Sequence, residues 1–357
     1  MTRSSSHIAI LGAGLIGLST ADTLLRRGQR VTLIETGARP MEGASFANSG
    51  MIHPSQAYSW VSDYNNPCAN AAVRELALRS RDLLHERMSA LGLDAMRANA
   101  PGCFQLFERE SDARAVRDCM TTQGMVVQVV SLGDLPVDKP ALYYEDDRWG
   151  DARAYGEALL ASLQARGAEI KAGCDVVLER AEDDQVHLFV DEDRFRTDQI
   201  IVAAGVGSVS LLESLALSLP IRPLRGWAVD FSRPEHVALP DVPLMDSASR
   251  SALTPFADRI RLSGTMGEDT PEALIKRWSD LMPALDLQQK SFDLVWSGER
   301  PVSELGRPII DKTPLADLWV NAGHGHMGWT LCAGSAEYLA KLMLDGATSA
   351  SFAYPLQ

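Results

Sequence analysis

The feature that most constrains the fold is a glycine-rich turn near the N-terminus, set between an apolar run and an amphipathic helix. Residues 7–11 form an apolar run typical of a buried strand, and they lead into the pattern Gly12-x-Gly14-x-x-Gly17. A helical repeat of apolar residues follows and ends before a second apolar run at 31–34. A strand, a helix and a strand in this order predict a βαβ unit and therefore a parallel sheet.

Each glycine of this turn has a physical role in binding a dinucleotide. Gly12 permits the tight turn, Gly14 lets a pyrophosphate approach the backbone, and Gly17 lets the helix pack closely against the strand. The N–H groups and the dipole at the helix N-terminus favour the negative charge of phosphate. Glu35 ends the second strand, where its carboxylate would accept hydrogen bonds from ribose hydroxyls and repel the 2′-phosphate of NADP. We therefore predict a dinucleotide site, with a merely tight turn as the alternative.

Length and charge narrow the class of protein. The chain has 357 residues, with 47 acidic and 34 basic side chains and a net charge of −13. At about 100–200 residues per domain, this length predicts two domains or one large domain with an insertion. The negative charge and the lack of a basic tract argue against nucleic-acid binding, which depends on Lys and Arg against phosphates.

Targeting and redox features predict a cytoplasmic protein, with a peripheral position at the inner membrane as the alternative. No apolar run approaches the roughly 18 residues of a spanning helix, and the N-terminal segment lacks a signal-peptide layout. The five cysteines are scattered, odd in number and without a C-x-x-C pair, so we expect reduced thiols, no disulfides and no zinc ribbon. No clustered ligands have suitable spacing, so no metal site is predicted.

The rest of the chain predicts a second domain of different architecture. Alternating apolar patterns at 227–231, 259–263 and 292–296 predict an antiparallel sheet. Caps at Asp151 and Thr270 predict the starts of two helices. Helices are predicted at 70–91, 111–123, 151–167, 271–282 and 328–344, and further strands at 103–107, 168–172, 175–179, 186–190 and 199–205. The fold class is therefore α/β, with a Rossmann-like domain joined to an α+β domain whose sheet is mainly antiparallel.

A long segment without clear periodicity, 39–67, follows the βαβ unit, and a loop of this length is typical of a functional element. Nicotinamide enzymes usually continue directly into a second βαβ unit instead. Within this segment, Glu42–Pro54 resembles the flavin loop of the D-amino acid oxidase superfamily, and its core Ser45-Phe46-Ala47-Asn48-x-Gly50 is most similar to D-amino acid dehydrogenases. Four further blocks resemble the superfamily in the same order: 167–170 with Val176, 201–205, 296–301 and 321–330. In length the chain is nearer to glycine and sarcosine oxidases.

The resemblance implies FAD as the cofactor and a discontinuous FAD-binding domain. We expect residues 1–80, 146–215 and 299–357 to form that domain, and residues 81–145 and 216–298 to form the substrate domain. The residues expected to contact FAD are Gly12, Ala13, Gly14, Leu15, Ile16, Gly17, Glu35, Thr36, Ala44, Ser45, Asn48, Ser49, Gly50, Met51, Val176, Ala204, Gly205, Gly325, His326, Met327, Gly328, Trp329 and Thr330.

The resemblance also implies a substrate-binding arginine. Arg300 matches the arginine that anchors the substrate carboxylate beneath the flavin in the family, and a guanidinium offers a planar, two-pronged match to a carboxylate. A structural salt bridge is the alternative for Arg300. His53 and His326 are further catalytic candidates, since each lies in a flavin loop, as does His324. Packing roles are the alternative for each histidine. Three aromatic residues beyond the first loop are candidates for the substrate pocket or for an exposed loop: Tyr58, Trp60 and Tyr64.

These features predict an FAD-dependent oxidoreductase acting on CH–NH or CH–NH2 groups. It would oxidise the Cα–N bond of a D-amino acid or related secondary amine to an imine, which water hydrolyses to an oxo acid. The alternatives are a glycine- or sarcosine-type oxidase, a catalytic subunit of an opine or hydroxyproline dehydrogenase complex, a non-catalytic FAD-containing subunit and a NAD-dependent dehydrogenase. The expected partners are a small-molecule substrate and an electron acceptor, which is oxygen, a quinone or a partner protein. A homo- or hetero-oligomer is compatible with each of these.

Overall fold

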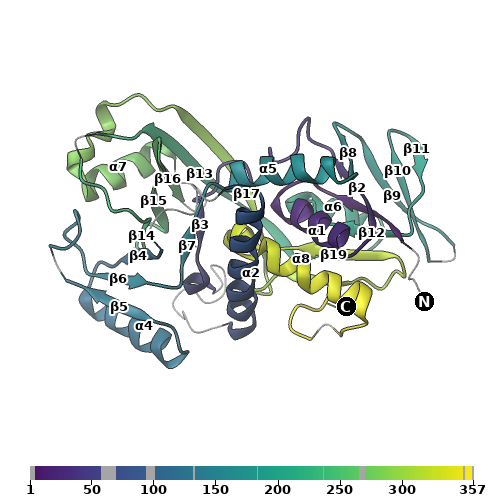
Figure 1. Ribbon diagram of the computed structural model, residues 1–357, viewed down its shortest axis with the longest axis horizontal. Coiled ribbons are helices and arrows are strands. Elements are labelled where there is room, and N and C mark those ends of the chain that lie inside the picture. Colours follow the sequence, from purple (N-terminus) through teal and green to yellow (C-terminus); the bar gives the residue numbers. More distant parts are fainter. Residues whose placement is uncertain are drawn as a thin grey trace.

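Two large sheets organise the protein, one toward each end of its long axis (Figure 1). The computed structural model describes residues 5–57, 70–93, 101–131, 133–182, 184–235, 237–264, 270–348 and 350–355. The candidate pocket aromatics Tyr58, Trp60 and Tyr64 lie outside these ranges.

The first sheet has the order β18-β19-β12-β1-β2-β8 and is parallel except for β18, which pairs antiparallel with β19. Its strands are β1 (His7–Leu11), β2 (Arg30–Glu35), β8 (Glu169–Ala172), β12 (Gln199–Val202), β18 (Ile309–Lys312) and β19 (Leu318–Ala322). Because its strands come from the beginning, middle and end of the chain, this sheet is discontinuous in sequence. It confirms the predicted Rossmann-like arrangement.

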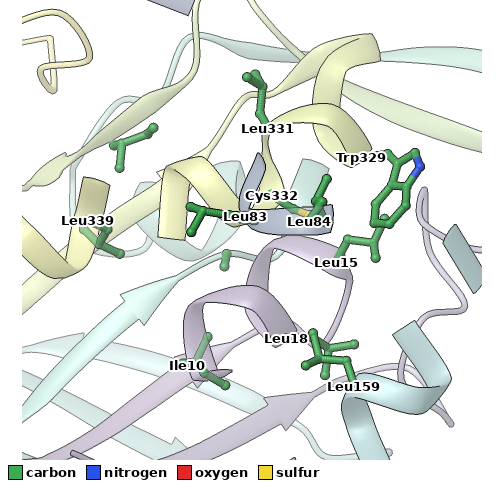
Figure 2. Packing of buried hydrophobic residues seen from close by; sticks show 14 of the residues in the cluster. Ile10, Leu15, Leu18, Leu83, Leu84, Leu159, Trp329, Leu331, Cys332 and Leu339 are labelled. Atoms are coloured by element: carbon green, nitrogen blue, oxygen red, sulfur yellow. The ribbon is translucent and has the colours of Figure 1, made fainter. Parts of the chain in front are cut away.

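Both faces of the parallel sheet are covered. Ile8 and Ile10 pack on one side with the helices, whereas Ala9 and Leu11 pack on the other with a three-stranded sheet and α6. The helices of the first face are α1 (Leu15–Arg26), α2 (Ala71–Ala90), α5 (Ala152–Ala165) and α8 (Gly328–Asp345); the opposite face carries β9 (Val176–Arg180), β10 (Val186–Val190), β11 (Asp193–Phe195) and α6 (Ser208–Glu213). Figure 2 shows the helical side, where Leu83 of α2 and Cys332 of α8 pack near the α1 helix.

The second sheet is antiparallel except where β14 pairs parallel with β4, in the order β17-β13-β16-β15-β14-β4-β6-β5. Its strands are β4 (Cys103–Leu106), β5 (Val127–Val130), β6 (Ala141–Tyr144), β13 (Ile221–Ser232), β14 (Leu244–Asp246), β15 (Ser251–Pro255), β16 (Arg259–Gly264) and β17 (Leu294–Ser303). Helix α7 (Pro271–Leu281) buries Leu274 and Trp278 against it, and α4 (Glu110–Thr122) packs beside β5 and β6. The predicted α/β fold with a mainly antiparallel second sheet is therefore confirmed.

The predicted helix caps are present. Asp151 accepts hydrogen bonds from the backbone N–H groups of Arg153 and Ala154, and Thr270 accepts one from Ala273. The segment 39–67, expected to be a loop, contains regular structure in its described part. Strand β3 (Met51–Ile52) pairs with β7 (Arg148–Trp149), and a short 3-10 helix, η1, covers Pro54–Gln56.

The predicted domain limits cut across two continuous elements. A division after residue 80 falls inside α2, whose Leu83, Leu84 and Met88 belong to the same core as α1 and α8. A division between 298 and 299 falls inside β17. These two predicted boundaries do not coincide with the ends of a helix or strand, and the limits of the two predicted domains stay a prediction.

The cysteines differ from expectation at one position. Cys103, Cys174 and Cys332 are buried free thiols, whereas Cys119 on α4 is disulfide-bonded. This corrects the prediction that the chain has no disulfide. No described helix is both long and apolar enough to cross a membrane, and no described group of three or more His, Cys, Asp or Glu residues could hold a metal ion.

Candidate active site

A cavity of about 390 Å³ lies where the β1–α1 turn, the end of β2 and the turn before α8 meet. These segments follow the carboxyl ends of parallel strands, which is where open α/β sheets bind ligands. Glu35 and Ala204 also line the cavity, so residues from distant parts of the chain share one site.

The geometry of the glycine-rich turn explains its residue types. Gly12 has a φ of +105°, and a Cβ there would lie 2.5 Å from the carbonyl oxygen of Ala203. A Cβ at Gly17 would lie 1.9 Å from the carbonyl oxygen of Gly12, so only glycine allows this helix–turn contact. The backbone N–H of Leu15 donates to Ser45 Oγ at 3.0 Å, which ties the start of α1 to the loop expected to bind flavin. The turn and that loop are therefore held together on one wall of the cavity.

Glu35 is held in place by two backbone groups. Its Oε2 accepts a hydrogen bond from the N–H of Ala13, and its Oε1 accepts one from the N–H of Gly37, both at 2.8 Å. A carboxylate has about four lone-pair sites, so Glu35 keeps the capacity to accept bonds from ribose hydroxyls. Ala13 does not line the cavity itself and instead orients this carboxylate.

Two polar side chains before α8 line the cavity with buried polar atoms. Asn321 donates from Nδ2 to Thr20 Oγ1 at 3.1 Å, but its buried Oδ1 has no hydrogen-bond partner among the described residues. The same holds for Nε2 of His324, and burial lowers the pKa of His324 to about 3. Buried polar groups are normally hydrogen-bonded, so these two atoms fit a site that a polar ligand completes. Asn321 was not among the predicted cofactor residues, although it begins the last block of resemblance.

Arg300 projects from β17 into the junction between this cavity and a smaller one of about 70 Å³. Its guanidinium occupies the space beside Gly226 on β13, where a Cβ would lie 1.8 Å from Nη1. Burial lowers the pKa of Arg300 to about 10, so the group remains charged at neutral pH. A cation buried at a cavity wall favours an anionic ligand.

His53 and His326 lie beside this junction, with ring centroids 6.0 Å apart. His326 Nε2 is 3.1 Å from the carbonyl oxygen of Gln56, and since a carbonyl only accepts, Nε2 carries the hydrogen. Burial is the main cause that holds the pKa of His326 well below its usual value, and it lowers the pKa of His53 to about 4. Both imidazoles are therefore neutral at physiological pH.

Most of the predicted site residues line the main cavity. Those that do are Gly12, Gly14, Leu15, Ile16, Glu35, Thr36, Ala44, Ser45, Asn48, Ser49, Met51, Val176, Ala204, Gly205, Arg300, Gly325, His326, Gly328 and Trp329. His53 lines only the smaller cavity.

Five of the residues expected to contact FAD do not line the main cavity: Ala13, Gly17, Gly50, Met327 and Thr330. Two of them support its walls, because Thr330 Oγ1 accepts from the His53 backbone N–H and the Gly50 carbonyl accepts from Trp329 Nε1. The residues that line the main cavity but were not among the predicted site residues include Met41, Ser210, Leu211 and Pro301.

The Rossmann-like sheet and the cavity at the carboxyl ends of its parallel strands define a dinucleotide-binding fold, which is combined here with a mainly antiparallel second sheet. Residues 7–342 match the DAO family model, described as FAD dependent oxidoreductase, and the chain belongs to this family. FAD is the cofactor of the family.

Individual relatives agree with this assignment. The chain is 26% identical to a D-amino acid dehydrogenase of Vibrio vulnificus (strain YJ016), over 94% of this chain and 95% of that protein. A D-amino acid dehydrogenase of Vibrio cholerae serotype O1 (strain M66-2) is also 26% identical, over 98% and 99% of the two chains. Glycine oxidase from Geobacillus kaustophilus shares the fold with a TM-score of 0.83 and 23% identity, covering 97% of this chain and 96% of its own.

The residues of the main cavity fit FAD. No Cβ obstructs the turn at Gly12 and Gly14, Glu35 offers a fixed carboxylate, and Asn321 and His324 carry buried polar atoms that a ligand could satisfy. These features are those expected of a site that binds a dinucleotide.

Proposed function

We propose that the protein oxidises the Cα–N bond of an amino acid or related secondary amine to an imine, which water then hydrolyses to an oxo acid and ammonia or an amine. The observation that carries this proposal is the buried Arg300 at the junction of the two cavities. The D-amino acid dehydrogenases to which the chain is similar support a D-amino acid as substrate.

The bound FAD supplies the acceptor for the hydride that leaves Cα. The Gly12–Gly14 turn and the start of α1 would hold its pyrophosphate, Glu35 would bind its ribose, and the loops at 44–51 and 325–330 would surround the flavin.

Arg300 would bind the substrate carboxylate through two parallel hydrogen bonds. Because the guanidinium is buried, the ion pair forms in a medium of low dielectric constant, where it is stronger than in water. Holding the carboxylate fixes the adjacent Cα and its hydrogen. Such positioning can contribute several kcal/mol, out of a maximum of about 7–11 kcal/mol for well-oriented reactants.

No general base is assigned to this site. His53 and His326 are neutral, and the described residues that line the smaller cavity include no Asp or Glu. The substrate would therefore bind with its amine already neutral, and its nitrogen lone pair would assist hydride departure. This accounts for the reaction without a side chain that accepts a proton.

Anaerobic mixing with candidate amines tests the proposal. The panel comprises D- and L-amino acids, glycine, N-methyl amino acids, opines and hydroxyproline, and a substrate is expected to bleach the flavin absorbance. Reoxidation by oxygen or by an artificial acceptor then separates an oxidase from a dehydrogenase. A flavin-loaded protein that no member of the panel reduces contradicts the proposal and favours a non-catalytic subunit.

Arg300→Ala and Arg300→Lys complete this test. Arg300→Ala should raise KM for the substrate about 10- to 150-fold with little loss of bound FAD, because a hydrogen bond to a charged group typically contributes about 1.5–3 kcal/mol. Arg300→Lys should restore part of the binding. Unchanged kinetics in Arg300→Ala would contradict the assignment of this residue.

A further inference from the structure

The smaller cavity is lined by a second arginine, Arg250, in the turn that joins β14 to β15. Arg300 reaches the same cavity from β17. Among the described residues that line this cavity there is no Asp or Glu, although the whole chain has a net charge of −13. The cavity is therefore a local positive region in an acidic protein.

The positive charges of Arg250 and Arg300 both affect the same side chain, His326. After burial and His53, the positive charges of Arg300 and Arg250 both contribute to the lowered pKa of His326, so both guanidiniums lie within electrostatic reach of this ring. His326 also lines the cavity. An anion in this space would interact favourably with both arginines.

The backbone of Arg250 is in a conformation that suits another residue type. Its φ is +51°, in the left-handed region that favours glycine. A hairpin turn with a left-handed residue normally carries glycine or asparagine there. Strained backbone held in place by its surroundings is typical of functional positions.

The surroundings that hold this turn are visible in its hydrogen bonds. Buried Asp246 accepts bonds from the backbone N–H of Ser249 at 3.1 Å and from Arg277 Nε at 2.8 Å. Arg277 Nη2 also donates to Asp246 at 2.9 Å. Asp246 and Arg277 thus anchor this turn, and Arg250 within it lines the smaller cavity.

We propose that the substrate is a small amine with two carboxylates, of which Arg300 binds the one next to the reacting carbon and Arg250 binds the second. This inference rests on the proposed function, which it narrows to a substrate class. A guanidinium forms a bidentate pair with a carboxylate, and the cavity volume of about 70 Å³ restricts the substrate to a compact molecule. The second carboxylate belongs either to an amino acid side chain or to a substituent on the nitrogen.

Arg250→Gly is the variant that tests Arg250, because glycine suits a positive φ and removes only the side chain. Arg250→Lys retains the charge, and Arg222→Gln, at an exposed position on β13, controls for the loss of one positive charge. Folding is checked by the melting temperature and the flavin content. Arg250→Gly is expected to match or exceed the wild-type melting temperature.

Binding of unreactive acids to the flavin-loaded protein gives a readout independent of turnover. By isothermal titration calorimetry, malonate and succinate should bind the wild type at least 10-fold more tightly than acetate and propionate. This preference should disappear in Arg250→Gly, persist in Arg222→Gln and be partly restored in Arg250→Lys. Equal binding of mono- and dicarboxylates by the wild type, or a preference that survives in Arg250→Gly, would overturn the inference.

Kinetics distinguish a second carboxylate on the amino acid side chain from one on the nitrogen substituent. They also test the proposed function separately from the inference about Arg250. Wild-type kcat/KM should be at least 10-fold higher for aspartate and glutamate, or for N-carboxymethyl amino acids, than for alanine and N-methylglycine. If neutral amino acids reduce the flavin equally well, the proposed function stands and this inference fails. If no amine reduces the flavin but dicarboxylate binding still depends on Arg250, the proposed function fails and the anion site stands.

Discussion

Replacing Gly226 by alanine would displace the guanidinium that the proposed mechanism depends on. The added Cβ would lie 1.8 Å from Arg300 Nη1 and 2.4 Å from Cζ, whereas ordinary contacts begin at about 3.4 Å. The guanidinium must therefore move by roughly 1.5 Å, because the buried arginine and the strand pairing of β13 with β17 leave the backbone little freedom. A misplacement of about 1 Å can cost about 100-fold in rate.

We therefore expect kcat/KM for the reducing amine to fall about 100-fold in Gly226→Ala, equivalent to about 2.7 kcal/mol of transition-state stabilisation. The measurement is anaerobic stopped-flow reduction of the bound flavin, corrected for flavin content. Gly334→Ala on α8 is a matched control, since its Cβ would lie 2.7 Å from the Leu76 carbonyl oxygen and away from both cavities. It should lower the melting temperature without changing kcat/KM of the loaded enzyme.

A double-mutant cycle decides whether Gly226 acts through Arg300. Once Arg300→Ala has removed the guanidinium, Gly226→Ala has nothing to displace, so the double variant should match Arg300→Ala alone. Additive losses, or wild-type kinetics in Gly226→Ala, would refute the reasoning.

Three further predictions concern charge and pH. Because burial lowers the pKa of Arg300 to about 10, kcat/KM should decline as the pH rises through 10, and Arg300→Lys should move that decline. Glu35→Ala removes the carboxylate, fixed by the N–H groups of Ala13 and Gly37, that is expected to accept hydrogen bonds from the ribose, so FAD affinity, measured by flavin titration of the apoprotein, should fall about 10- to 150-fold, since a hydrogen bond to a charged group contributes about 1.5–3 kcal/mol. Burial raises the pKa of Asp147 from 3.8 to about 7, despite two hydrogen bonds from Ser55. A raised folded-state pKa gives a stability contribution that is complete below about pH 4 and lost as the pH rises toward 7. Urea unfolding of the wild type should show this decline, and Asp147→Asn should flatten it. A flat wild-type profile would contradict the pKa.

Local features of the chain were predictable because they depend on near neighbours. The glycine spacing, the strand before it and Glu35 after it indicated the βαβ unit, and each has a short-range reason in turn geometry or helix packing. The caps at Asp151 and Thr270 also act over a few residues, through bonds to backbone N–H groups of the first helical turn.

Contacts between distant segments were not predictable from pattern. Nothing in the sequence indicates that β14 pairs parallel with β4, or that Gly226 leaves room for Arg300 from another strand. Asn321 begins the 321–330 block but was not predicted as a lining residue, because only the assembled cavity shows its buried oxygen. The disulfide at Cys119 was missed because odd, scattered cysteines carry no pairing signal.

The sequence by itself determined a dinucleotide-binding sheet and membership of an FAD-dependent oxidoreductase family, because those depend on contiguous motifs with local physical requirements. The tertiary structure alone decided that Arg250 and Arg300 line one small cavity without a described carboxylate. Strand pairing and a turn anchored by Asp246 bring these arginines together. The sequence sets how far apart the two arginines are along the chain, but only folding brings their positive charges to the same cavity, where both can act on one ligand.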